Sequence, residues 1–179
     1  MDLGWFLVFF GFVGGSMGVL VLLLRRFEYP PGRREPIQLG AELYGYPGIE
    51  ADIEVIRLMD KALRTAGTPA SRIDISHAGV FRALVKAAEL DEDAELKILQ
   101  LLQSKDVPGL RDCCVAVEEP YRSALLSLPE LYGGIELLDG ACAKLPALPE
   151  ILSALETLRV LQQALPELPL SFDLADLRG

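Results

Sequence analysis

The sequence contains one histidine and three cysteines, and it is short of positive charge. Its 17 lysines and arginines stand against 26 aspartates and glutamates, which gives a net charge of -9 and a pI of about 4.7. Proteins bind nucleic acids through a basic surface, so this balance argues against a nucleic-acid partner. The cysteines Cys113, Cys114 and Cys142 do not form a disulfide framework, and we expect all three to be small buried residues in a reducing compartment.

The signatures of catalysis and of cofactor binding are also missing. The sequence has no glycine-rich phosphate loop, no nucleophile beside a base, and no cysteines and histidines at metal-ligand spacing. His77, the single histidine, stands between a short predicted strand and a helix. A histidine in that position is more often a capping residue than a catalytic base, which needs a positioned partner. The sequence therefore predicts no catalytic residue, no metal ligand and no cofactor.

The N-terminal segment carries no charge over residues 3–24, which is about the 20 residues that a helix needs to cross a bilayer. Arg25 and Arg26 follow at once, so a single span here would leave the rest of the chain in the cytoplasm. The segment has no basic start and no cleavage site, which argues against a signal peptide. Two interpretations stay open: a membrane anchor, or an aberrant start fused to a genuine coding region.

Residues 34–45 predict a β-strand with two different faces. The two-residue period of a strand puts Gln38, Gly40, Glu42 and Tyr44 on one face, and leaves only packing residues on the other. A buried carboxylate needs a cation or several donors, and a glycine leaves room for a ligand against the sheet. A bound ammonium group would satisfy Glu42. An ordinary strand with one solvated face is the alternative.

The rest of the chain predicts helices and short strands in alternation. Acidic residues crowd the start of one helix after Leu90, and Asp106 is placed to cap the next one. The leucine stripes of the later helices indicate core packing. The predicted elements are a helix over 47–67, a strand at 73–76, a helix over 78–88, a helical region over 90–165 and a strand at 168–174.

The strand at residues 34–45 resembles the second signature motif of class II aminoacyl-tRNA synthetases. The version is that of histidyl-tRNA synthetase and its relatives, and the sequence is most similar to the family of ATP phosphoribosyltransferase regulatory subunits. The resemblance covers about four-fifths of the chain in order, and residues 1–33 resemble nothing in the family. The other segments that carry it are residues 48–58, 76–84, 105–111, 128–134 and 171–179.

The resemblance implies an α+β fold, in which part of a class II synthetase-like antiparallel sheet with helices precedes a mostly helical insertion. It implies a partial synthetase-like core over residues 34–89, which follows the hydrophobic N-terminal segment of residues 1–33, a possible membrane span or aberrant start. A helical region over residues 90–167 and a truncated returning strand over residues 168–179 follow. The family's first motif and its C-terminal pocket loop would be missing, so we expect an impaired subunit.

The function that the resemblance implies is regulatory and non-catalytic. The family joins the short-form ATP phosphoribosyltransferase catalytic subunit in a cytoplasmic hetero-oligomer for the first step of histidine biosynthesis, with histidine as the feedback effector. By position, Gln38 and Glu42 would contact the α-amino end of histidine. Two rivals remain: a fragment of histidyl-tRNA synthetase, and a membrane-anchored helical interaction protein that depends on residues 3–24.

Overall fold

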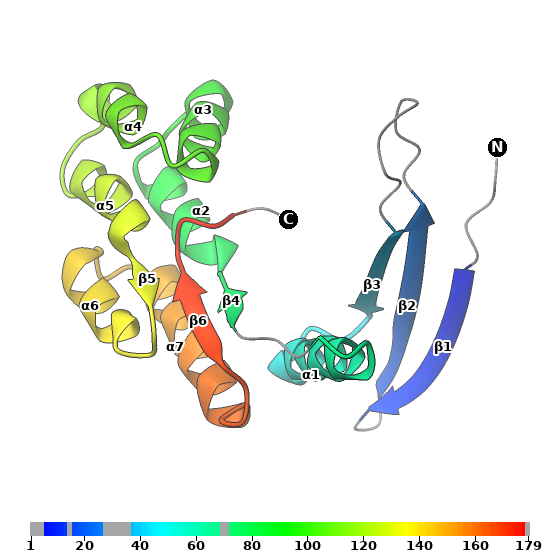
Figure 1. Ribbon diagram of the computed structural model, residues 1–179. Helices are drawn as coiled ribbons and strands as arrows, with labels where there is room; N and C mark the ends of the chain where they lie inside the picture. The colour runs from blue at the N-terminus through cyan, green and yellow to red at the C-terminus, as the bar shows by residue number, and fades with distance from the viewer. Residues whose placement is uncertain (1–5, 14–15, 27–36, 69–71, 178–179) are drawn as a thin grey trace. The chain divides into compact units, whose positions relative to one another are not determined.

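The computed structural model of the protein describes residues 6–13, 16–26, 37–68 and 72–177 of the 179 (Figure 1). Up to residue 40, and at residue 42, it describes the backbone alone. The chain forms two compact units, residues 1–69 and residues 70–179. The boundaries implied by the resemblance, after residues 33, 89 and 167, remain predictions.

The first unit begins with a three-stranded antiparallel sheet. Its strands β1 (Phe6–Val13), β2 (Ser16–Arg26) and β3 (Ile37–Tyr44) lie in the order β1-β2-β3. The uncharged segment 3–24, whose length would suit a membrane helix, thus contributes two strands instead. Its valines and phenylalanines favour β-strands. An apolar segment of this length can form two strands that pair with each other, or one helix, and its sequence pattern does not decide between them. Among the described residues, no helix is long and apolar enough to cross a membrane.

Helix α1 (Ile49–Thr65) follows β3 and confirms the helix predicted over residues 47–67. Acidic residues lie in its first turn and a basic residue in its last turn, the arrangement that the helix dipole favours. Gly67 then adopts a φ of 75°, the left-handed conformation in which glycine commonly ends helices. Asp60 is only 9% exposed, and its carboxylate accepts a hydrogen bond from Arg64 Nε at 2.7 Å.

The second unit is mostly helical and contains a small sheet. The prediction of helices throughout residues 90–165 is wrong at β5, because a strand of two residues is too short to give a periodic pattern. The elements are β4 (Ile73–Ile75), α2 (Ala78–Ala87), α3 (Glu92–Gln103), α4 (Val107–Cys113), η1 (Cys114–Ala116), α5 (Tyr121–Ser127), η2 (Leu128–Glu130), β5 (Tyr132–Gly133), α6 (Leu137–Lys144), α7 (Pro149–Ala164) and β6 (Leu170–Asp173).

Strand β6 is the central strand of this second sheet. It pairs in parallel with β4, with Ile75 opposite Phe172, and antiparallel with β5, with Tyr132 opposite Asp173. Figure 1 shows the three strands side by side, with β6 between β5 and β4. The strand predicted at residues 168–174 is therefore confirmed, and both of its partners belong to the second unit.

The core of the second unit is built from the leucine stripes of its helices. Helix α2 packs against α7, and Leu84 of α2 and Leu155 and Leu158 of α7 have no exposed surface. Phe172, on the central strand, is also fully buried. The interpretation of the leucine stripes as core is confirmed.

Helix α3 has a side-chain cap at its N-terminus, which gives a testable prediction. Asp91 Oδ1 accepts a hydrogen bond from the backbone N–H of Ala94 at 2.8 Å. The variant Asp91→Ala is expected to lower the free energy of unfolding by about 1 kcal/mol, because the first turn then loses its acceptor. Chemical denaturation followed by helical circular dichroism measures the loss. Asp91→Asn keeps an acceptor and should lose clearly less; an equal loss would contradict the capping role.

Candidate functional site

The residues that the resemblance assigns to a ligand lie on β3. Gln38 pairs with Arg25 of β2, and Glu42 pairs with Val21. Positions 38, 40 and 42 occupy one face of the strand, because residues two apart in a strand share a face. The side chains of Gln38 and Glu42 lie outside the described residues. The backbone of β3 thus confirms the predicted strand, and the contacts of the two side chains stay predictions.

The turn that leaves β3 holds an exposed tyrosine, Tyr44, and a half-buried one, Tyr46, which contacts the start of α1. Gly45 has a φ of 87°, so the chain bends there in a conformation that favours glycine. Tyr44 is 55% exposed. Tyr46 donates a hydrogen bond from its hydroxyl to Glu50 Oε2 at 3.2 Å, and this bond raises the pKa of Tyr46. The end of β3 therefore places aromatic and acidic groups near the predicted ligand face.

A second polar cluster, which the sequence does not reveal, lies at the ends of β4 and β6. A cavity of about 420 Å³ is lined there by Asp74, Ser76, Asp173 and Asp176. Parallel strands end at the same edge of a sheet, which brings the residues after β4 beside those after β6. The Ser76 hydroxyl oxygen is buried and has no hydrogen-bond partner among the residues that the structure describes. The cluster joins segments about a hundred residues apart in the chain, so no local motif could have predicted it.

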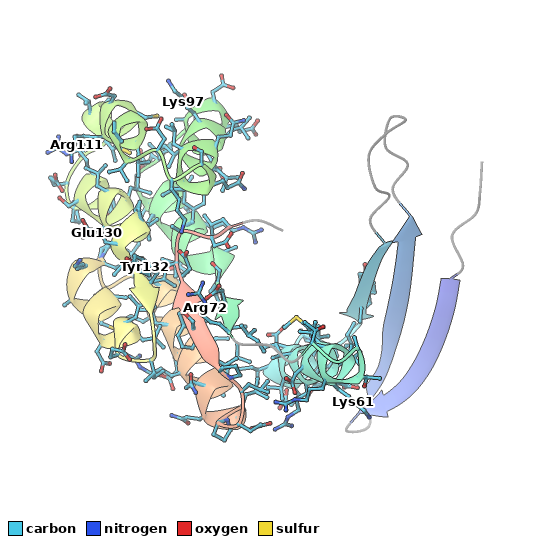
Figure 2. The ribbon with its side chains drawn as sticks, viewed as in Figure 1. Lys61, Arg72, Lys97, Arg111, Glu130 and Tyr132 are labelled. Carbon is cyan, nitrogen blue, oxygen red and sulfur yellow. The ribbon has the colours of Figure 1, made fainter. Side chains whose placement is uncertain are left out.

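Cations from outside the cavity balance two of these carboxylates. Lys105 Nζ lies 3.3 Å from Asp173 Oδ2, and Arg72 Nε lies 2.9 Å from Asp74 Oδ1. Figure 2 shows Arg72 beside the strand that carries Asp74. The backbone N–H of Ala175 also donates to Asp173 Oδ1, at 3.0 Å. Because charges are paired and hydrogen-bonded here, the cluster stabilises the turn after β6 and resembles no catalytic acid–base pair.

His77 caps helix α2, as predicted. Its Nδ1 accepts a hydrogen bond from the backbone N–H of Gly79 at 3.0 Å. The Nδ1 lone pair is thus used to accept a hydrogen bond from the helix N-terminus, so His77 has a structural role as a helix cap. Among the residues that the structure describes, no group of three or more histidines, cysteines, aspartates and glutamates is arranged to hold a metal ion.

The cysteines are not all buried, which corrects the prediction from the sequence. Cys114 is buried, Cys113 is half-buried and Cys142 is exposed. Cys142 lies on the outer side of α6, where its sulfur accepts a long hydrogen bond of 3.6 Å from Arg159 Nη2 of α7, and this contact raises the pKa of Arg159. The prediction failed because cysteine is usually buried, and composition alone does not say which helix face a residue occupies.

The fold is that of the class II aminoacyl-tRNA synthetases and their relatives, in agreement with the predicted α+β class. The crystal structure of an ATP phosphoribosyltransferase regulatory subunit/histidyl-tRNA synthetase from Bacillus halodurans matches with a TM-score of 0.65 and 21% identity. That match covers 96% of this chain and 42% of the other. An ATP phosphoribosyl transferase (HisG:HisZ) complex from Thermotoga maritima matches with a TM-score of 0.55 and 15% identity, over 97% of this chain and 56% of the other.

The family model described as histidyl-tRNA synthetase matches residues 22–179, and the chain belongs to this family. The match begins upstream of residue 34, so the expectation that residues 1–33 resemble nothing in the family is wrong for residues 22–33. That stretch includes the second half of β2, the strand that pairs with β3. Its apolar composition hid the relationship, because many strands share such a pattern.

The curated relatives are regulatory subunits, which confirms the resemblance. The ATP phosphoribosyltransferase regulatory subunit of Azoarcus sp. is 58% identical over 146 residues, which are 82% of this chain and 38% of the relative. The subunit of the same description from Chromobacterium violaceum is 47% identical over 147 residues, with the same two shares, 82% and 38%. The chain thus spans less than half the length of these relatives.

Proposed function

We propose that this chain is part of a regulatory subunit of ATP phosphoribosyltransferase and that it catalyses no reaction itself. The observation that carries the proposal is the 58% identity over 146 residues to the Azoarcus subunit. The chain acts in the first step of histidine biosynthesis, in the cytoplasm, as the partner of the short-form catalytic subunit. The sequence supports this role, since it offers no nucleophile beside a base and no phosphate loop.

Histidine binds on the ligand face of β3 in this proposal. Glu42 receives the α-ammonium group of histidine, and Gln38 contacts the same end of the molecule from the same strand face. A carboxylate that faces a bound ammonium gains a charge-assisted hydrogen bond, which is about twice as strong as a neutral one. Gly40 stands between them and leaves space for the ligand backbone.

Feedback inhibition follows from such binding under one thermodynamic condition. Histidine shifts the assembly towards its inhibited state only when it binds that state more tightly than the active one. The coupling is reciprocal, so the catalytic subunit also changes the affinity of the regulatory subunit for histidine.

Changing Glu42 to glutamine is expected to weaken histidine binding about tenfold, because the ammonium group loses a charged acceptor while the side-chain shape is kept. Isothermal titration of the full chain with histidine measures the effect. Glu54→Gln on α1 removes one negative charge from the same unit and serves as the control. Equal affinities of the two variants for histidine would contradict the placement of the histidine site on β3.

The partner is tested separately from the ligand. The full chain is mixed with the short-form catalytic subunit from the same source, and co-elution in size-exclusion chromatography is expected. A fragment of histidyl-tRNA synthetase is the second candidate, favoured by the description of the matching family model. Transfer of histidine to its tRNA by the chain, without co-elution, would favour that candidate over the regulatory subunit.

A further inference from the structure

The second unit has another cavity, of about 590 Å³, that the proposed function does not use. It lies where the end of α2 meets α3 and the segment that leads from η1 into α5. A volume of a few hundred cubic ångströms is in the range of sites for small molecules or single side chains. Its lining includes Glu89, Leu90, Ala94, Ile98, Val117, Glu118 and Tyr121.

The charges at this cavity are all of one sign. Among the described residues that line it, Glu89 and Glu118 are the only aspartates, glutamates, lysines or arginines, and the described residues place no cation in ion-pair contact with either. Lys86, close to Glu89 in sequence, pairs with a glutamate of α7 at 3.5 Å. Arg122, close to Glu118, pairs with Glu119 at 2.8 Å. The cavity therefore keeps an uncompensated negative potential, which attracts cations.

The C-terminal end of α2 adds to that potential. Ala87 and Ala88 end the helix at the cavity, and a helix C-terminus carries partial negative charge. Glu89 follows with a φ of 52°, in the left-handed conformation in which glycine is favoured. The chain thus places a glutamate in a backbone position where glycine would be less strained, and that residue lines the cavity.

The remaining lining is apolar. Ile98 is fully buried and Val117 is 8% exposed, so the apolar surface that a bound molecule can reach includes that of the half-buried Leu90 and Ala94. An apolar surface next to two carboxylates suits a molecule with an aliphatic stem and a cationic head, the shape that lysine and arginine side chains also have. Tyr121 belongs to the same lining, and a tyrosine hydroxyl can accept or donate a hydrogen bond.

We propose that this cavity binds a guanidinium or ammonium group carried on a short aliphatic chain. Glu89 and Glu118 receive the cationic head, and the stem lies along Leu90 and Ala94. A free aliphatic amine and an arginine or lysine side chain of a partner protein share this chemistry. The site involves neither Gln38 nor Glu42, so it stands independently of the proposed histidine site.

Nuclear magnetic resonance titration of the full chain with three probes tests the proposal. Agmatine represents the free molecule, N-acetyl-arginine methylamide represents a protein side chain, and N-acetyl-norleucine methylamide has the stem without the charge. Saturable shifts are expected at Ala94, Ile98 and Tyr121 with at least one of the two cationic probes, and not with norleucine. The tighter of the two cationic probes identifies the source. An absence of saturable shifts with both would overturn the proposal.

Two variants separate the charged and the apolar parts of the site. The double variant Glu89→Gln/Glu118→Gln should weaken the cationic probe about tenfold, because two charge contacts are lost. Ala94→Leu fills the apolar lining and should block the stem while α3 tolerates leucine. Glu136→Gln, which removes an exposed charge outside the cavity, should leave binding unchanged. Equal affinity in the double variant and in Glu136→Gln would show that the cavity does not recognise the cation.

Discussion

Replacing Leu155 with alanine is expected to lower the free energy of unfolding of the second unit by about 2–5 kcal/mol. Leu155 lies on the inner face of α7 and has no exposed surface. The truncation removes buried methyl groups and leaves a cavity that the packed helices cannot fill completely. Urea titration followed through the amide signals of α7 reports this unit directly.

Leu152 provides a matched control on the same helix. It is 45% exposed, so Leu152→Ala removes the same atoms from a position that water already reaches. Its cost is expected to stay below about 1 kcal/mol. If the two variants lost equal stability, the orientation of α7 against α2 would be wrong.

The second large effect concerns the reactivity of the cysteines. Burial, with a smaller contribution from the neighbouring Cys113, raises the pKa of Cys114 from 9.0 to about 11. The thiolate is the reactive form, so at pH 8 a rise of that size cuts the reactive fraction of Cys114 about 100-fold. Cys142 is exposed. Alkylation by iodoacetamide, followed by mass spectrometry, is therefore expected to label Cys142 at least about 100-fold faster than Cys114.

Cysteine variants and unfolding by urea show which cysteine is labelled and whether the folded structure protects it. Cys142→Ser should abolish the fast labelling, Cys114→Ser should preserve it, and in concentrated urea the rates should converge. Comparable labelling of Cys114 and Cys142 in the folded chain would contradict the burial of Cys114. The raised pKa also predicts that the stabilising contribution of Cys114 is complete below pH 9 and is lost as the pH rises towards 11, because the unfolded chain releases its proton first.

Much of the fold follows from local sequence patterns. Residues 47–67 carried charges and apolar residues at helical spacing and became α1. Asp106 was recognisable as a cap because a proline follows it in the first helical turn, and its carboxylate does bond the N–H of Gly109 at 3.0 Å. These predictions succeeded because each depends on residues within a few positions of one another.

The failures have physical causes of another kind. The apolar segment over residues 3–24 fits a long helix or two paired strands equally well, and only pairing with β3 decides between them. Strand β5 exists because β6 supplies its hydrogen-bond partner, not because Tyr132 and Gly133 favour a strand. Tertiary context overrides local preference in both cases.

The candidate sites divide in the same way. Gln38 and Glu42 were found from one strand and from resemblance, since their spacing is local. The cavity that holds Asp173 and Ser76, and the one that holds Glu89 and Glu118, bring together residues that are distant in the sequence. No periodicity or local motif predicts that these residues lie close together, because their proximity depends on how the helices and strands pack in the tertiary structure.

The central position of β6 governs the order in which the second unit can be completed during synthesis. Strand β4 is made early, yet its hydrogen-bond partner β6 follows nearly one hundred residues later. Closing so long a loop costs conformational entropy, which is offset only when the hydrogen bonds and contacts of the complete sheet form. Such non-local pairing slows folding. The helices between the two strands are synthesised before β6, so we expect them to pack first and to leave the site of Phe172 open until β6 is made. We therefore expect the sheet to form last, when β6 inserts between β4 and β5.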